Sequence, residues 1–163
     1  MSERITHLAQ RLQEEGEKTL DFFRAISPEK WRTQVYGDGA TWTIHEILCH
    51  FVDAEHYLRL MVADVLAGGP GAPDSMDLDA VNAHNARHVA KLACREPAAL
   101  LEAFAQERQA TIATFETTDD ANLDRVGRHP VLGPKPAAEL LKTIYVHNKG
   151  HQRDIQRALG VSS

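Results

Sequence analysis

Apolar residues recur at helical spacing in four long stretches of this 163-residue chain, and runs of alternating β-branched residues are absent. Segments that contain glycine and proline separate these stretches, which is typical of helices joined by loops. The pattern therefore predicts an all-α fold, a four-helix bundle with antiparallel or crossover connections. Because the chain is 43% hydrophobic and long enough to bury one core, we expect a single domain over residues 1–163.

Capping residues and helix breakers mark the ends of the helical regions. Thr43 and Glu46 have the spacing of a capping box, Asp77 is a favourable N-cap, and Pro136 is suited to the first turn of a helix. Pro97 predicts a break or a short extra helix within the third region. The four predicted regions are residues 2–26, 44–67, 77–118 and 136–160, and the segment GRHPVLGPKP before the last one is expected to be a loop.

Charge and composition exclude several classes of protein. The net charge is -5 and the 18 Lys and Arg residues form no run, so we expect no nucleic-acid partner. No stretch approaches the roughly 20 apolar residues that span a bilayer, and the N-terminus lacks the apolar segment of a signal peptide. We therefore expect a cytoplasmic protein with no membrane partner. Cys49 and Cys94 are expected to be reduced thiols, with Cys49 a small core residue.

Three histidines predict a metal site. His147 and His151 are four residues apart in VHNKGHQRD, so both rings project from one face of a helix and can hold one ion. His50 lies in the apolar run EILCHFVDA and is the candidate for a third ligand from another helix. A second pair, His84 and His88, has the same spacing, and periodicity alone does not choose between the two pairs. An ordinary histidine pair without a metal is a further alternative.

Other site motifs fail or are absent. The segment His45 to His50 resembles the zinc-protease motif HExxH, but its second histidine comes one residue late and points to another face of the helix. No Glu is followed by His three positions later, which excludes a ferritin-like di-iron centre. The sequence also lacks a P-loop, a GxGxxG loop and a GxSxG elbow.

The segments WTIHEILCHFVDAEHY, DAVNAHNARHVAKL, GRHPVLG and AAELLKTIYVHNKGHQRDIQRAL together resemble the DinB-like superfamily of metalloenzymes. YfiT-type hydrolases and the metal-binding domain of mycothiol-dependent maleylpyruvate isomerase belong to it. The resemblance implies a DinB/YfiT-like bundle in which His50, His147 and His151 are the metal ligands, in preference to His84 and His88. It also implies a homodimer.

Asp154 departs from the family pattern, which often has Gln at this position. Its carboxylate is expected either to orient a metal ligand or to form pairs on the helix surface. Glu46 and Asp53 are also close to proposed ligands in sequence, but no general acid or base is assigned and the catalytic residues stay unknown.

Three neutral imidazoles suit a divalent metal ion; we expect zinc, with nickel as the alternative. Three protein ligands leave a coordination position open, which is typical of a catalytic site. The resemblance implies either transfer of a low-molecular-weight thiol cosubstrate to an electrophile or hydrolysis of a small-molecule substrate. The alternative is a non-catalytic metal- or ligand-binding stress-response module that acts as a homodimer.

Overall fold

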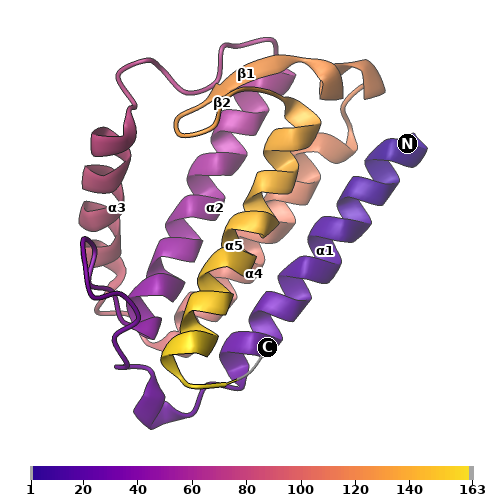
Figure 1. Cartoon of the computed structure of the whole chain (residues 1–163). Coiled ribbons are helices and arrows are strands. Elements are labelled where there is room, and N and C mark those ends of the chain that lie inside the picture. Colours follow the sequence, from indigo (N-terminus) through magenta and orange to yellow (C-terminus); the bar gives the residue numbers. More distant parts are fainter. Residues whose placement is uncertain (1, 162–163) are drawn as a thin grey trace.

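The computed structural model describes residues 2–161 and shows a helical bundle with a short β-hairpin across one end (Figure 1). Met1, Ser162 and Ser163 fall within the predicted domain but lie outside the described residues. The helices are α1 (Glu3–Arg24), α2 (Ile44–Leu66), α3 (Leu78–Leu92), α4 (Pro97–Glu116) and α5 (Ala137–Ala158). The short elements are the 3-10 turns η1 (Pro28–Lys30) and η2 (Asp120–Asp124) and the strands β1 (Val126–His129) and β2 (Gly133–Pro136).

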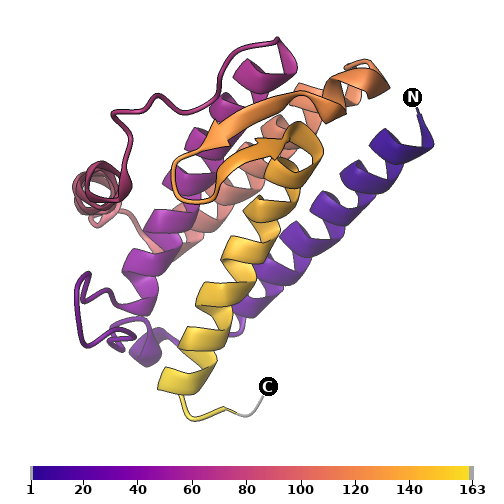
Figure 2. The same cartoon turned by 45° about the horizontal axis from the view of Figure 1, so that its top comes forward.

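Four of the five helices form the bundle. α1 and α2 each pack against both α4 and α5, whereas α3 lies outside the bundle against α2 (Figures 1 and 2). Since α3 carries the chain back along the outside, α2 and α4 run in one direction, and α1 and α5 run in the opposite one (Figure 1). The predicted all-α four-helix bundle is confirmed. The predicted break in the third region is also present, because the chain forms two separate helices there and the second, α4, begins at Pro97.

The start of α2 is fixed by the predicted capping box. The hydroxyl of Thr43 accepts a hydrogen bond from the backbone N–H of Glu46, and the Glu46 carboxylate accepts one from the backbone N–H of Thr43 at 2.8 Å. This exchange satisfies backbone donors that have no partner within the helix. The carboxylate of Glu46 therefore has a structural role in positioning the helix that carries His50.

The expected loop GRHPVLGPKP instead contains the antiparallel hairpin of β1 and β2, in which Arg128 pairs with Pro134. Strands of four residues are too short to show the alternating pattern from which strands are predicted. Gly127 lets β1 approach α2 closely, because a Cβ built there would lie 2.1 Å from a methyl carbon of Val65. The hairpin carries His129 as the last residue of β1.

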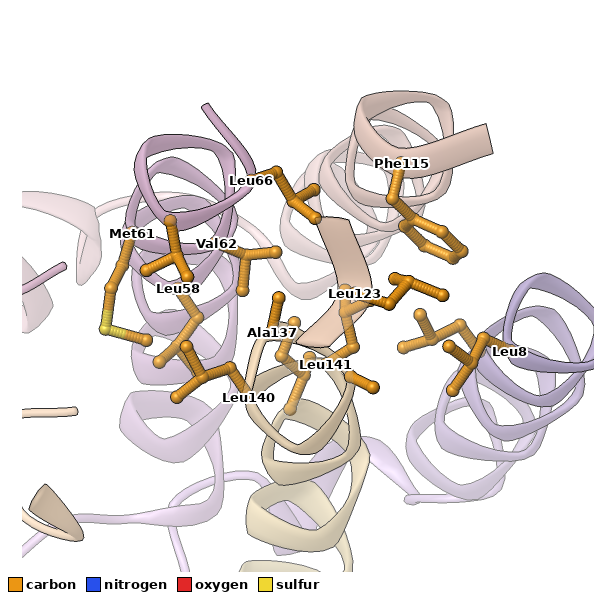
Figure 3. Close-up of a cluster of buried hydrophobic side chains, with 14 of the residues drawn as sticks. Leu8, Leu58, Met61, Val62, Leu66, Phe115, Leu123, Ala137, Leu140 and Leu141 are labelled. Carbon is orange, nitrogen blue, oxygen red and sulfur yellow. The ribbon is translucent and has the colours of Figure 1, made fainter. Parts of the chain in front are cut away.

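The apolar core is divided into two clusters. The cluster near the hairpin joins α1, α2, α4, α5 and η2 through side chains such as Leu8, Leu58, Phe115 and Leu123 (Figure 3). The second cluster lies toward the opposite end, where the ring of Phe51 packs edge-on against that of Phe23.

One polar group between the helices is a fully satisfied ion pair. Arg108 donates two hydrogen bonds to Glu55, at 2.7 and 3.0 Å, and a third to the carbonyl of Leu12 at 2.8 Å. Thr111 donates a further hydrogen bond to Glu55 at 2.9 Å. Because each charge has its partners, this network binds α1, α2 and α4 together.

Cys49 and Cys94 are both free, as expected. Cys49 is buried in the core, and burial raises the pKa of its thiol to about 12. None of the helices in residues 2–161 is both long and apolar enough to cross a lipid bilayer.

Candidate metal centre

The structure brings His50 of α2 together with His147 and His151 of α5. His50 is 5% exposed and follows the buried residues Leu48 and Cys49, so its ring is directed into the bundle. Nε2 of His147 lies 2.9 Å from Nε2 of His50 and 3.2 Å from Nε2 of His151. The helical spacing therefore produces the expected convergence of three imidazoles from two helices; that they bind a metal stays a prediction.

Hydrogen bonds determine which nitrogen of His151 carries the proton. The hydroxyl of Tyr36 donates its single hydrogen to Asp154 at 2.8 Å, since a carboxylate can only accept. The same hydroxyl lies 2.5 Å from Nδ1 of His151, so Nδ1 must donate to it. Nε2 of His151 is left with a lone pair directed toward the other two histidines.

His147 has the same tautomer as His151, with the proton on Nδ1. Its Nδ1 lies 3.3 Å from the side-chain oxygen of the buried Asn148 and donates to it, which leaves a lone pair on Nε2. The lone pairs of His147 and His151 then face each other without a proton between them. Nδ1 of His50, which is buried, has no hydrogen-bond partner among the described residues.

The spacing of these nitrogens fits a shared metal ion. Metal–nitrogen bonds of about 2.0–2.1 Å separate two ligand nitrogens by about 2.8–3.0 Å at a right angle and by about 3.3–3.4 Å at the tetrahedral angle. The observed separations of 2.9 and 3.2 Å fall within these limits. The donor set, three imidazole nitrogens, is one that divalent first-row metals accept.

Burial keeps the three imidazoles neutral. It is the main cause that lowers the pKa of each ring, well below the usual value for His50 and to about 4 for His151. Mutual repulsion adds to the effect on His50 and His151, because a proton on either would face His147. Binding of a metal ion here would therefore release few protons near neutral pH.

A cavity of about 440 Å³ opens onto the three histidines. Its walls are largely apolar, with Trp42, Tyr57 and Met76 among them, and no Lys or Arg is among the residues that line it. His129 also lines the cavity, and its Nδ1 accepts hydrogen bonds from two backbone N–H groups at 3.1 Å. Its neutral ring therefore carries the proton on Nε2, as a hydrogen-bond donor.

The alternative histidines lie elsewhere. His84 and His88 are on α3, outside the bundle, where both rings contact Asp53. Nε2 of His45 donates a hydrogen bond to the carbonyl of Arg95, 2.8 Å away, and His45 takes no part in the cluster around His50. The rejection of the HExxH interpretation agrees with this placement.

Asp154 makes contacts on both sides considered for it, toward the histidine cluster and on the helix surface. One carboxylate oxygen accepts from Tyr36, and the other accepts from Arg157 on the helix surface at 2.6 Å. Tyr36 was missed by the sequence analysis, because it lies in the irregular segment before α2, which no periodicity describes. Asn148 could have been found, since it occupies a core position on the same stripe of α5 as Ile144 and Ile155.

Comparison with known proteins connects this arrangement to a family and to two solved structures. A family model described as the DinB superfamily matches residues 11–155. Mycothiol-dependent maleylpyruvate isomerase is similar in structure with a TM-score of 0.73 and 12% sequence identity, over 95% of this chain and 63% of the isomerase. This chain thus spans less than two thirds of the isomerase's length.

The second similar structure is YfiT from Bacillus subtilis, described as a probable metal-dependent hydrolase with an unusual four-helix bundle topology. It matches with a TM-score of 0.73 and 16% identity, over 99% of this chain and 91% of YfiT. None of the curated proteins matches the sequence. At these identities the two structures establish a shared fold.

Proposed function

The chain belongs to the DinB superfamily, and from this premise we propose that it is a metal-dependent enzyme whose His50, His147 and His151 bind one divalent ion. The observation that carries the proposal is the meeting of three neutral Nε2 atoms within metal-ligand spacing, at the wall of a cavity large enough for a small molecule. A divalent ion supplies a Lewis acid, which makes a thiol or water more acidic and polarises a carbonyl group.

The surrounding residues hold the imidazoles in position. Tyr36 and Asp154 fix the ring of His151 through its Nδ1, and the ring of Trp42 packs on that of His50 with centroids 4.9 Å apart. Partners of this kind set the tautomer and the direction of a ligand and raise its basicity. Burial prevents protons from competing for the same nitrogens.

The cavity favours a small, mainly apolar substrate. Its aromatic and aliphatic walls provide contact area, and without Lys or Arg it offers no side-chain counter-ion for an anion. His129 can donate a hydrogen bond from Nε2 to an oxygen of the substrate. We propose either transfer of a low-molecular-weight thiol to an electrophile or hydrolysis, with zinc as the metal, nickel as the alternative, and a cytoplasmic homodimer as the working form.

Metal content tests the first step. When the untagged protein is loaded with Zn²⁺ and freed of excess metal, elemental analysis should find one ion per chain fewer in His147→Ala than in the wild type. The control is His56→Ala, because His56 is an exposed histidine of α2 that pairs with Glu107 away from the cavity. Equal retention in wild type and His147→Ala would refute the site.

Turnover tests the second step. The metal-loaded protein is assayed with a thiol plus an aryl halide and, separately, with an aryl ester, and His147→Ala serves as the inactive control. Activity on only one substrate type identifies the reaction class. Bound metal without turnover of either type would overturn the enzyme proposal in favour of the non-catalytic binding module.

A further inference from the structure

Asp53 of α2 lies one turn from His50 and makes a second cluster with histidines. Its side chain is 10% exposed, and each of its oxygens contacts a different imidazole of α3. Oδ2 is 2.9 Å from Nε2 of His84, and Oδ1 is 2.7 Å from Nδ1 of His88. The three groups offer one carboxylate and two ring nitrogens, all within 4.8 Å of one another.

The partners of Asp53 distinguish it from the buried acids Glu15 and Glu55. Glu55 is neutralised by Arg108, and Glu15 contacts the ammonium groups of Lys18 and Lys149. Among the described residues, Asp53 pairs only with imidazoles. A largely buried carboxylate is costly unless a positive charge accompanies it, and no Lys or Arg among the described residues pairs with Asp53.

We infer that Asp53, His84 and His88 form a second site for a divalent first-row transition-metal ion, distinct from the three-histidine centre. Two imidazoles and one carboxylate are a donor set that such ions accept, and the carboxylate supplies the negative charge that the three-histidine centre lacks. His84 and His88 are 22% and 35% exposed, so an ion can reach them from solvent. The two sites share no ligand.

Such an ion would attach α3 to the bundle. Among the residues of α3 only Val89 is buried, so few apolar contacts hold this helix against α2. α3 also forms one wall of the cavity through residues such as Val81 and Asn85. A metal that joins Asp53 to His84 and His88 therefore stabilises the wall of the cavity without touching the three-histidine centre.

Titration of Zn²⁺ into the His147→Ala variant tests the inference, because this variant lacks a ligand of the three-histidine centre. Calorimetry should detect one ion per chain. Adding His88→Ala or Asp53→Asn should weaken this binding by at least about 10–100-fold, since even loss of an outer partner of a ligand has that effect. The matched control adds His56→Ala, a histidine of α2 outside both clusters, and should leave the affinity unchanged.

Hydrogen exchange of the α3 amides gives an independent measurement. With Zn²⁺ at about 100 times its dissociation constant, exchange that requires detachment of α3 should slow about 100-fold in His147→Ala, and by no more than about 10-fold when His88→Ala is added. Asp53→Asn preserves the shape of the side chain and serves if His88→Ala disturbs the fold. Absence of Zn²⁺ binding in His147→Ala, or equal binding after the second substitutions, would overturn the site whatever the outcome at His50.

Discussion

Tyr36→Phe is the substitution that tests most directly how the three-histidine centre is organised. The hydroxyl of Tyr36 links Nδ1 of His151 to the carboxylate of Asp154, and the substitution removes it while the ring remains. The ring packs edge-on against His151 with centroids 5.9 Å apart, so the apolar contact is kept. The change therefore isolates the hydrogen bonds.

The expected loss of Zn²⁺ affinity is about 10–100-fold, the usual effect of removing an outer partner of a ligating histidine. This corresponds to about 1.4–2.8 kcal/mol of binding free energy. The physical reason is that His151 loses the acceptor that fixes its proton on Nδ1 and its lone pair on Nε2. The free energy of unfolding of the metal-free protein should fall by about 1–3 kcal/mol, the net value of two hydrogen bonds.

Affinity is measured by competition with a chromophoric chelator at pH 7.5, and unfolding by urea titration of the metal-free protein. Tyr57→Phe is the matched control, because Tyr57 lines the same cavity but its ring packs on His84 at 5.5 Å and not on the three-histidine centre. A Zn²⁺ affinity within twofold of the wild type in Tyr36→Phe would refute the orienting role of the hydroxyl.

Three further predictions concern the rest of the fold. Glu55→Ala leaves Arg108 buried without its counter-charge and should lower the free energy of unfolding by about 3–5 kcal/mol in urea titration, and a loss below about 1 kcal/mol would contradict the buried-pair interpretation. At pH 8 a thiol reagent should label Cys94 in the native protein and reach Cys49 only after unfolding, because burial raises the pKa of Cys49 to about 12; rapid labelling of both thiols would contradict this. Since the folded pKa of His151 is about 4, below that of the unfolded chain, the metal-free protein should lose roughly 2–3 kcal/mol of stability as the pH falls from 6.5 to 4. Urea titrations across this range measure it, and an equal loss in His151→Gln would assign the effect to other groups.

The helices could be predicted because their signals are local. Apolar spacing gave the stripes that face the core, and Thr43 with Glu46 marked the start of α2 to the residue. The hairpin was missed because its strands are four residues long and its pairing depends on contact with α2 through Gly127. Short strands of this kind are determined by tertiary packing more than by their own sequence.

The site could be predicted only in part. Spacing places His147 and His151 on one helix face, but it places His84 and His88 on one face equally well. The choice between the pairs depends on which helix enters the bundle, and only the resemblance to a family indicated it. The contact of Tyr36 with His151 spans 115 residues, so no local pattern announces it.

The buried polar groups of the protein fall into two kinds, and the difference indicates which of them bind ligands. Glu55 and Arg108 satisfy each other, so nothing is missing from their surroundings and their effect is on stability. Beside His50, His147 and His151 direct lone pairs toward each other, and Asp53 has a charge but only imidazoles as partners. Both of these clusters become satisfied when a cation is added, whereas a cation near Glu55 would compete with Arg108. The same physical rule, that buried charges and lone pairs need partners, therefore assigns the first group to the fold and supports the proposals that the other two bind cations.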